Sequence, residues 1–349
     1  MDGLQAILML MIFHCSSGNL QFALYLNSLI AQLVFILGAH LRYLPATNGA
    51  PLSVTTEAYQ TTRHLRNLFW TAYVLDKELS LRAGQPVAIH DEDCDLSLPP
   101  GYEEQLYILL SSSESDGMVI GSPLFPTDLR LIKIRSRAYT TLYQPGSFCE
   151  PGIKLESIRQ LDSDLEMWRV SLPLKCRPGL LTSQLIATGN TIADIHILVV
   201  RMDYHHCMAM IHQASGRCKA WTGTQNNTID GVDLSFKIAV ETSRSSIISL
   251  QNSLHVTPNS AFWLLVFYPI SASFAIFCGI LLDPSDPDAR QDLKLLHQTV
   301  NLIKGLPLPQ LSGAMHVARF VRLVFELCRL ANLAITEAEK KLFGSDPRE

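Results

Sequence analysis

Four carboxylates stand within five positions of this sequence: Asp91, Glu92, Asp93 and Asp95. Clustered carboxylates are the ligands that calcium and magnesium prefer, so this acidic segment is a candidate for metal chemistry. Asp91, Asp93 and Asp95 match positions 1, 3 and 5 of an EF-hand loop. Leu96 replaces the glycine of position 6, however, and Tyr102 replaces the glutamate of position 12. The spacing therefore excludes an EF-hand.

Two interpretations of the acidic segment remain. It could bind magnesium and diphosphate, as the aspartate-rich motif of all-helical terpene cyclases does, but the second metal-binding motif of those enzymes is not found. Alternatively, its carboxylates stabilise a chain reversal by accepting backbone N–H bonds near helix N-termini. A magnesium site needs several convergent oxygen ligands, so the sequence favours the structural interpretation.

A histidine-rich stretch is the other candidate for chemistry. His196, Asp203 and His206 fall on one helix face at about 100° per residue, so a metal site is geometrically possible. No repeated H-x-x-x-H spacing accompanies them, which favours packing in a core helix. There is also no Gly-rich phosphate loop, no G-x-S-x-G elbow and no CxxC pair among eight cysteines. We therefore predict no catalytic, cofactor-binding or metal-binding residues.

Helical periodicity dominates the elements around these candidates. Ile158, Leu161, Leu165 and Trp168 recur at helical spacing, which predicts an amphipathic helix. Alternating strand patterns are almost absent, so we expect an all-α fold, a large irregular bundle around an apolar core. One further predicted helix contains Leu129, Ile132, Ala138 and Leu142. The others are Ile192–Gln213, Leu234–Leu254, Ala261–Leu282 with a bend at Pro269, Ala289–Lys304 and Gly313–Phe343. The predicted loops are Ser111–Thr127 and Ser215–Gly231.

Two uncharged stretches, Phe22–Leu41 and Ala261–Leu282, are long enough to cross a bilayer. The first contains Asn27, Ser28 and Gln32, the second contains Pro269, and neither has a flanking cluster of Lys or Arg. Helices that are apolar on all sides also occur inside large α proteins. We therefore expect buried core helices and no association with a membrane.

The helix before the acidic segment carries an apolar face that runs from Leu65 to Leu79. Arg66 lies one turn before Trp70, a spacing that permits a cation–π contact, and we expect Trp70 to be buried. Gly84 should end the helix, because glycine readily takes the left-handed cap, and Pro86 prevents the helix from resuming.

Residues 63–99 resemble the signature of the fungal-specific transcription factor domain, the middle homology region of fungal zinc-cluster regulators. The matching residues are Arg66, Phe69, Trp70, Tyr73, Asp76, Ser80, Gly84, Pro86, Ile89, Asp91, Asp93, Asp95, Leu98 and Pro99. Gln85 stands where the family often has arginine. Other stretches resemble later helices of the family in order, so the resemblance implies one regulatory domain over residues 1–349, whose early helices the chain could lack. It also implies that the signature residues are structural.

Members of that family bind DNA through an N-terminal two-zinc module with six cysteines, and no such cysteine pattern is found in this sequence. The net charge is −4, and the only local basic stripe is Arg130, Lys133 and Arg137. We therefore expect no zinc or other cofactor and no direct DNA binding by this chain. The resemblance implies a nuclear regulatory domain that controls transcription through other transcription-factor chains, coregulators or a small effector. The alternative is a cytoplasmic enzyme or small-molecule-binding protein of a biosynthetic pathway that reuses the same helical fold.

Overall fold

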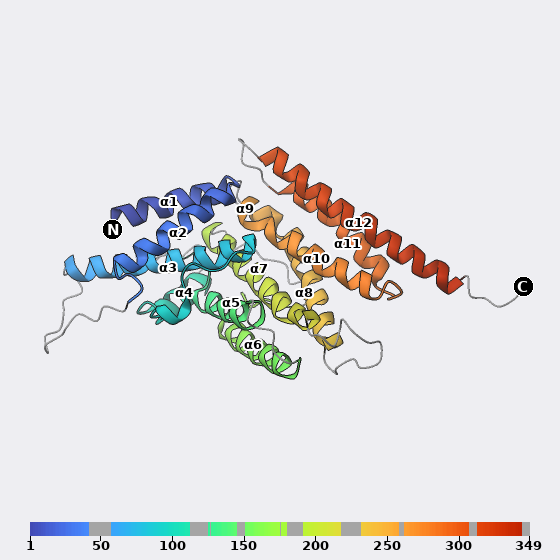
Figure 1. The fold of residues 1–349 in the computed structure, drawn as a ribbon, viewed down its shortest axis with the longest axis horizontal. Coiled ribbons are helices and arrows are strands. Elements are labelled where there is room, and N and C mark those ends of the chain that lie inside the picture. Colours follow the sequence, from blue (N-terminus) through green and yellow to red (C-terminus); the bar gives the residue numbers. More distant parts are fainter. Residues whose placement is uncertain are drawn as a thin grey trace, which may run out of the picture. The chain divides into compact units, whose positions relative to one another are not determined.

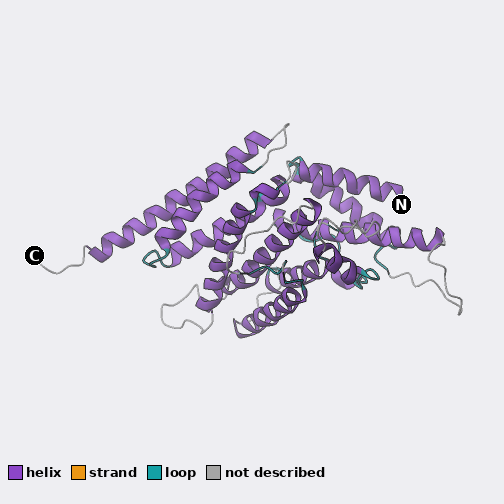
Figure 2. Cartoon of the chain, turned by 180° about the vertical axis from the view of Figure 1, so that it is seen from behind, coloured by secondary structure: helices purple, strands orange, loops and turns teal. Residues whose placement is uncertain are grey.

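A computed structural model of the chain describes residues 1–41, 57–111, 125, 127–144, 151–174, 176–179, 191–217, 232–257, 262–306 and 313–343. Helices joined by short turns make up nearly all of this part of the chain, and no strand occurs in it (Figures 1 and 2). The all-α prediction is confirmed. The chain divides into two compact units, Met1–Ser136 and Arg137–Glu349, which are described separately.

The first unit begins with a hairpin of α1 (Asp2–Ser16) and α2 (Leu20–Ile36), and both of these helices contact α3 (Glu57–Ala83). A 3₁₀ turn (Asp91–Asp93) follows α3 and leads to α4 (Tyr102–Ser111). The unit boundary falls within α5 (Leu129–Leu142), of which residues up to Ser136 belong to the first unit. The signature residues 63–99 therefore lie wholly in this unit.

The second unit is built around α7 (Thr191–Gln213), which packs against α6 (Pro151–Ser171), α8 (Val232–Asn252) and α10 (Phe267–Leu282). α10 in turn packs against α11 (Ala289–Gly305) and α12 (Gly313–Phe343). The short pieces of this unit are the 3₁₀ turns Ala214–Arg217 and Leu254–Val256 and the one-turn helix α9 (Phe262–Leu265).

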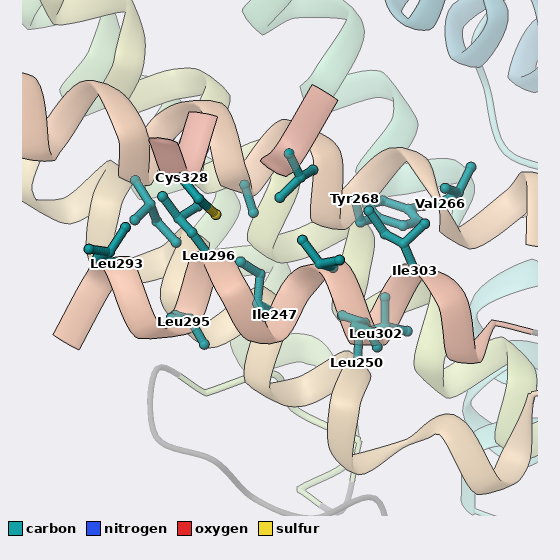
Figure 3. Packing of buried hydrophobic residues seen from close by; sticks show 14 of the residues in the cluster. Ile247, Leu250, Val266, Tyr268, Leu293, Leu295, Leu296, Leu302, Ile303 and Cys328 are labelled. Atoms are coloured by element: carbon teal, nitrogen blue, oxygen red, sulfur yellow. The ribbon is translucent and has the colours of Figure 1, made fainter. Parts of the chain in front are cut away.

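Buried residues from α7, α8, α10, α11 and α12 form one hydrophobic cluster in the second unit (Figure 3). Its members include Ile247 and Leu250 of α8 and Leu296 and Ile303 of α11. Gly279 of α10 allows its helix to approach α8 closely, because a Cβ at this position would lie only 2.9 Å from Cγ2 of Val240. The helices predicted from Ile192 onward match α7 to α12 to within about two residues, except at one break.

That break separates α9 from α10 and lies three residues before Pro269. Proline has no N–H, so the carbonyl of Leu265, four residues earlier, loses its helical hydrogen bond. The predicted bend at Pro269 is therefore an interruption at Val266. The helix α4 had no counterpart among the predicted elements. The predicted loops Ser111–Thr127 and Ser215–Gly231 lie largely outside the described residues.

The expectation that the first long apolar stretch forms a fully buried helix is wrong. α2 buries one side, with Ala23, Leu26 and Ile30, but leaves Tyr25 and Ile36 exposed on the other. The described part of the chain contains no helix with the length and hydropathy needed to cross a bilayer.

Candidate functional site

The signature helix α3 brings three aromatic rings into the core of the first unit. Phe69, Trp70 and Tyr73 are fully buried, with ring centroids 5.5 to 5.9 Å apart. Their spacing of one and three residues places them on one side of a helix, where edge-to-face packing of aromatic rings is favourable. The predicted burial of Trp70 is confirmed.

Arg66 joins three separate segments of the first unit. Its guanidinium carbon lies 4.4 Å from the Phe69 ring centre and 5.6 Å from that of Trp70, as the predicted cation–π contact requires. Its Nη1 atom donates to the carbonyls of Ala39 and His40, each at 3.2 Å. Its Nη2 atom donates to the carbonyl of Asp95. The end of α2 and the acidic segment are thus held to α3 by one side chain.

Asp76 is a fully buried carboxylate with three hydrogen-bond donors around it. Its Oδ1 atom accepts from the side-chain amide of Asn27 at 2.7 Å and from the N–H of Ala88 at 2.9 Å. Its Oδ2 atom accepts from the N–H of Ile89 at 3.1 Å and lies 3.8 Å from Nζ of Lys77. A buried charge is tolerated when it is paired and hydrogen-bonded, and Asp76 meets both conditions.

Asp91, at the start of the acidic segment, is a second centre of hydrogen bonding. We call the bonds around Asp76 and Asp91 the signature network. Its Oδ1 atom accepts from the Tyr73 hydroxyl at 2.9 Å and the Ser136 hydroxyl at 3.0 Å, and lies 3.0 Å from Nζ of Lys77. Lys77 itself is buried and also donates to the carbonyl of Ile89. Burial, together with the Asp91 charge, raises the pKa of the Tyr73 phenol, so that this hydroxyl stays protonated and donates.

The turn between α3 and the acidic segment is formed as predicted. Gly84 takes a left-handed conformation with φ of 63°, and the N–H of Gln85 donates to the carbonyl of Ser80 at 3.0 Å, which closes the helix end. The Ser80 hydroxyl then donates to the carbonyl of Pro86 at 3.3 Å. Pro99 ends the segment, and its carbonyl accepts from the N–H of Tyr102 at the start of α4.

The carboxylates of the acidic segment have unlike environments. Asp91 accepts bonds from side chains, whereas Asp95 accepts from the N–H of Ser97 at 2.7 Å, the backbone bond expected at a chain reversal. Asp93 is exposed to solvent, which differs from the structural role that the resemblance implies for it. Burial raises the pKa of the neighbouring Cys94 thiol to about 11, so this cysteine stays protonated near neutral pH and is a poor nucleophile.

Asn27, Lys77 and Ser136 complete the network, but sequence reasoning did not single them out. Asn27 lies 49 residues before Asp76, and Ser136 lies 45 residues after Asp91. One signal was available, since Asn27 shares a helix side with Ala23, Ile30 and Ala31, and buried amides need partners. Lys77 offered a second signal, because it sits one turn after Tyr73 on a helix that is otherwise packed.

The residues of the histidine-rich helix serve packing in the second unit. Asp203 accepts a hydrogen bond from the Tyr268 hydroxyl at 2.7 Å, and the His206 ring lies 5.0 Å from the ring of Phe267. His205, between them, is buried, which lowers its imidazole pKa to about 4. No set of three or more metal-ligating side chains gathers anywhere within the described ranges, His196 included.

The basic stripe of α5 is engaged in contacts within the chain. Arg130 forms an ion pair with Asp128 at 2.8 Å, and Nζ of Lys133 donates to the carbonyl of Leu96 at 3.1 Å. Arg137 pairs with Asp164. Each of these cations therefore has a competing partner in place before any phosphate could approach.

A cavity of about 700 Å³ opens between α8, the end of α10 and the start of α11 in the second unit. Its apolar wall includes Phe236 and Ile280, and its rim is acidic. Arg244 lines the cavity and donates two hydrogen bonds to the carboxylate of Asp292, of 2.6 and 2.8 Å. The acidic lining residues are Asp233, Glu241, Asp283, Asp286, Asp288 and Asp292, against the two cations Lys237 and Arg244.

Comparison with known proteins assigns a class to this arrangement. Residues 1–170 match the family described as "Fungal specific transcription factor domain". The matched range contains the whole first unit with its signature network, and it ends within α6. The resemblance inferred from the signature is therefore confirmed.

Individual relatives are fungal transcription regulators. The chain is 30% identical over 359 residues to an "ABC-transporter-regulating transcription factor" of Aspergillus oryzae, across 99% of this chain and 38% of that protein. It is 21% identical over 343 residues to the "Fusaridione A cluster transcription factor" of Fusarium heterosporum, across 96% of this chain and 60% of that protein. A transcriptional regulatory protein of Schizosaccharomyces pombe is 22% identical over 297 residues, which are 79% of this chain and 43% of that protein. The chain thus spans well under half of the Aspergillus relative, and no solved structure matches it.

Proposed function

We propose that residues 1–349 act as one regulatory domain of a fungal transcription regulator, working in the nucleus through contacts with other proteins. The observation that carries this proposal is the similarity to the Aspergillus transcription factor, which extends over 99% of the chain and therefore over both compact units.

The environment of the signature network supports a structural role over a catalytic one. The carboxylates of Asp76 and Asp91 are both occupied by donors from the chain itself, and a catalytic acid or base needs access to a substrate proton. Cys94 is held in its protonated form. We therefore propose that the signature residues other than the exposed Asp93 fix the geometry of the domain, and that none of them performs chemistry.

We further propose that residues 1–349 do not bind DNA by themselves. Its net charge of −4 gives no long-range attraction to phosphate. The basic stripe offers three cations, whereas a site-specific protein commonly makes about six or more phosphate contacts. Arg130, Lys133 and Arg137 would also have to leave Asp128, Leu96 and Asp164.

The regulatory role is tested by tethering. The 349-residue chain is fused to a heterologous DNA-binding domain, and transcription of a reporter with the matching operator is compared with that of the DNA-binding domain alone. We expect the fusion to change reporter output, and an Asp76→Ala variant, which should destabilise the first unit, to reduce that change. Equal output from all three proteins would contradict the proposal.

DNA binding is tested separately with the unfused chain. An electrophoretic shift assay on promoter DNA at about 150 mM salt suppresses weak non-specific binding, because phosphate contacts are screened at that ionic strength. We expect no sequence-specific shift. A specific shift that survives a chelator would contradict this part of the proposal while leaving the regulatory role intact.

A second candidate function is the binding of a small effector, and the cavity beside α8 is the observation that favours it. Its volume of about 700 Å³ falls within the roughly 300–1,000 Å³ of ligand pockets. The cavity is lined by six acidic and two cationic side chains, and this excess of negative charge favours a cationic ligand. Spermidine serves as the probe, and we expect it to raise the melting temperature of the parent more than that of an Asp233→Asn variant. Glu337→Gln, an exposed change on α12 outside the cavity, is the matched control.

A further inference from the structure

The hairpin of α1 and α2 carries an apolar surface that the other described helices of the first unit leave exposed. It consists of Met9, Phe13, Phe22, Tyr25, Leu29 and Ile36, and we call it the α1–α2 apolar face. Tyr25 is 69% exposed and Ile36 is 78% exposed, whereas large apolar side chains on a monomer are normally buried. The rings of Phe22 and Tyr25 lie 6.1 Å apart, so the surface is continuous at this end of α2.

The residues on α2 follow the spacing of a helix–helix seam. Phe22, Tyr25, Leu29, Gln32 and Ile36 are separated by three, four, three and four positions, and all five are exposed. That spacing keeps one stripe facing a partner helix along its whole length. The stripe lies opposite Ala23, Ile30 and Val34, which pack into the first unit, so it is not part of that core.

The charge of this region restricts what the face can bind. Asp2 is the only formally charged side chain among the first 41 residues, which contain no Lys or Arg. Helices that lie on membrane surfaces typically carry Lys or Arg on their polar side, so a lipid surface fits poorly. A charged peptide or a nucleic acid would find no counter-charge. The partner that fits is another uncharged apolar helix face.

The exposed area is that of a standard protein interface. Large side chains offer roughly 150–250 Å² each, so the exposed fractions of these six give a face on the order of 700 Å². The largest apolar patch on a typical monomer covers about 300–600 Å². A stable interface uses about 800 Å² from each partner, which this face can nearly supply alone.

We propose that the α1–α2 apolar face is the dimer interface of this chain and that its partner is the same face of a second copy. A two-fold interface must be self-complementary. The stripe meets that condition in an antiparallel pairing centred on Leu29, which places Phe22 opposite Ile36 and Tyr25 within one residue of the position opposite Gln32 of the other copy. The Tyr25 hydroxyl can then donate to the Gln32 amide oxygen, so the single polar member of the stripe has a partner.

Sedimentation velocity of the full 349-residue chain over a dilution series tests the proposal. We expect a dimer with a dissociation constant in the micromolar range or tighter. Leu29→Glu places two like charges at the axis, which should weaken the dimer by at least about 100-fold. Met167→Glu is the matched control, because Met167 is 62% exposed on α6 and outside the face. The Met167→Glu variant should dimerise with the same dissociation constant as the parent. Circular dichroism checks that every variant is folded.

A compensating pair of substitutions tests the register of the two α2 helices. It also keeps the proposal testable if Leu29→Glu fails to fold. Tyr25→Lys alone should weaken the dimer, and adding Gln32→Glu should restore it by at least about tenfold, because opposite charges then face each other across the axis. Failure of that rescue would overturn the antiparallel pairing. The proposal is overturned if the parent is monomeric throughout, or if its dimer withstands both single substitutions. A monomeric parent that sediments with phosphatidylcholine–phosphatidylserine vesicles would assign the face to membranes instead.

Discussion

Replacing Asp76 should test the signature network most directly, because this one carboxylate accepts from three donors in two other segments, α2 and the turn at residues 88–89. Asp76→Ala would leave the Asn27 amide and the N–H groups of Ala88 and Ile89 without their acceptor in a fully buried site. Each unsatisfied buried donor costs about 1–3 kcal/mol, and breaking a buried charged pair costs about 3–5 kcal/mol. We expect Asp76→Ala to lower the free energy of unfolding by about 3–5 kcal/mol.

Urea unfolding followed by circular dichroism measures this loss. Asp76→Asn keeps one acceptor oxygen, so its cost should be smaller, about 1–3 kcal/mol. Asp93→Ala is the matched control, since Asp93 lies in the same acidic segment but is exposed, and it should stay within about 0.5 kcal/mol of the parent. If Asp76→Ala and Asp93→Ala unfold at the same urea concentration, the buried carboxylate does not hold the segment in place.

Three further predictions concern other parts of the chain. Trp70→Ala should destabilise by about 3–5 kcal/mol in a thermal melt, and an unchanged melting temperature would contradict the packing of α3. Calorimetric titration with Ca²⁺, Mg²⁺ and Zn²⁺ should give no stoichiometric heat, whereas tight binding lost in Asp91→Asn would restore the metal interpretation. Burial lowers the pKa of His205 to about 4, so the unfolded chain takes up this proton first, and about 2–3 kcal/mol of stability should be lost between pH 6.5 and pH 4.5. His205→Gln should remove that part of the pH dependence, as urea titrations at each pH would show.

The helices were predictable because their signals are local. The apolar spacing of Ala289–Lys304 and the breakers before it define α11, which spans Ala289–Gly305. The left-handed cap at Gly84 was predictable for the same reason, since it depends on the backbone conformation of one residue. The short helix α4 was missed, because it spans only ten residues and lies between the acidic segment and a loop-like stretch.

The partners within the signature network were not predictable in the same way. The family resemblance pointed to Asp76, but its bond to Asn27 joins residues 49 positions apart, and no periodicity carries that information. The exposed side of α2 was mistaken for core for a related reason. Hydropathy along a helix that is apolar all round does not tell which side its neighbours cover, and only the packing of α1 and α3 decides it.

The hydrogen bond from Asn27 offers a physical reason why α2 buries one of its apolar sides and exposes the other. Both sides of the helix carry apolar residues, so burial of hydrophobic area alone distinguishes them weakly. The bond from Asn27 to Asp76 forms in only one rotation of α2 about its axis, the rotation that leaves Tyr25 and Leu29 outside. Buried polar groups can specify register in this way at some cost in stability.

Asn27→Leu tests this idea, because it removes the bond and keeps the side-chain volume. We expect a modest loss of about 1–2 kcal/mol but a larger effect on the orientation of α2. A cysteine introduced by Ala31→Cys, at a buried position, reports that orientation through its labelling by a thiol reagent, read by mass spectrometry. Labelling should be slow in the parent background and at least about tenfold faster with Asn27→Leu, if the helix then samples other rotations. Ser28→Cys, at an exposed position, should label quickly in both backgrounds. Unchanged protection at position 31 would mean that apolar packing against α1 and α3 is sufficient to orient α2.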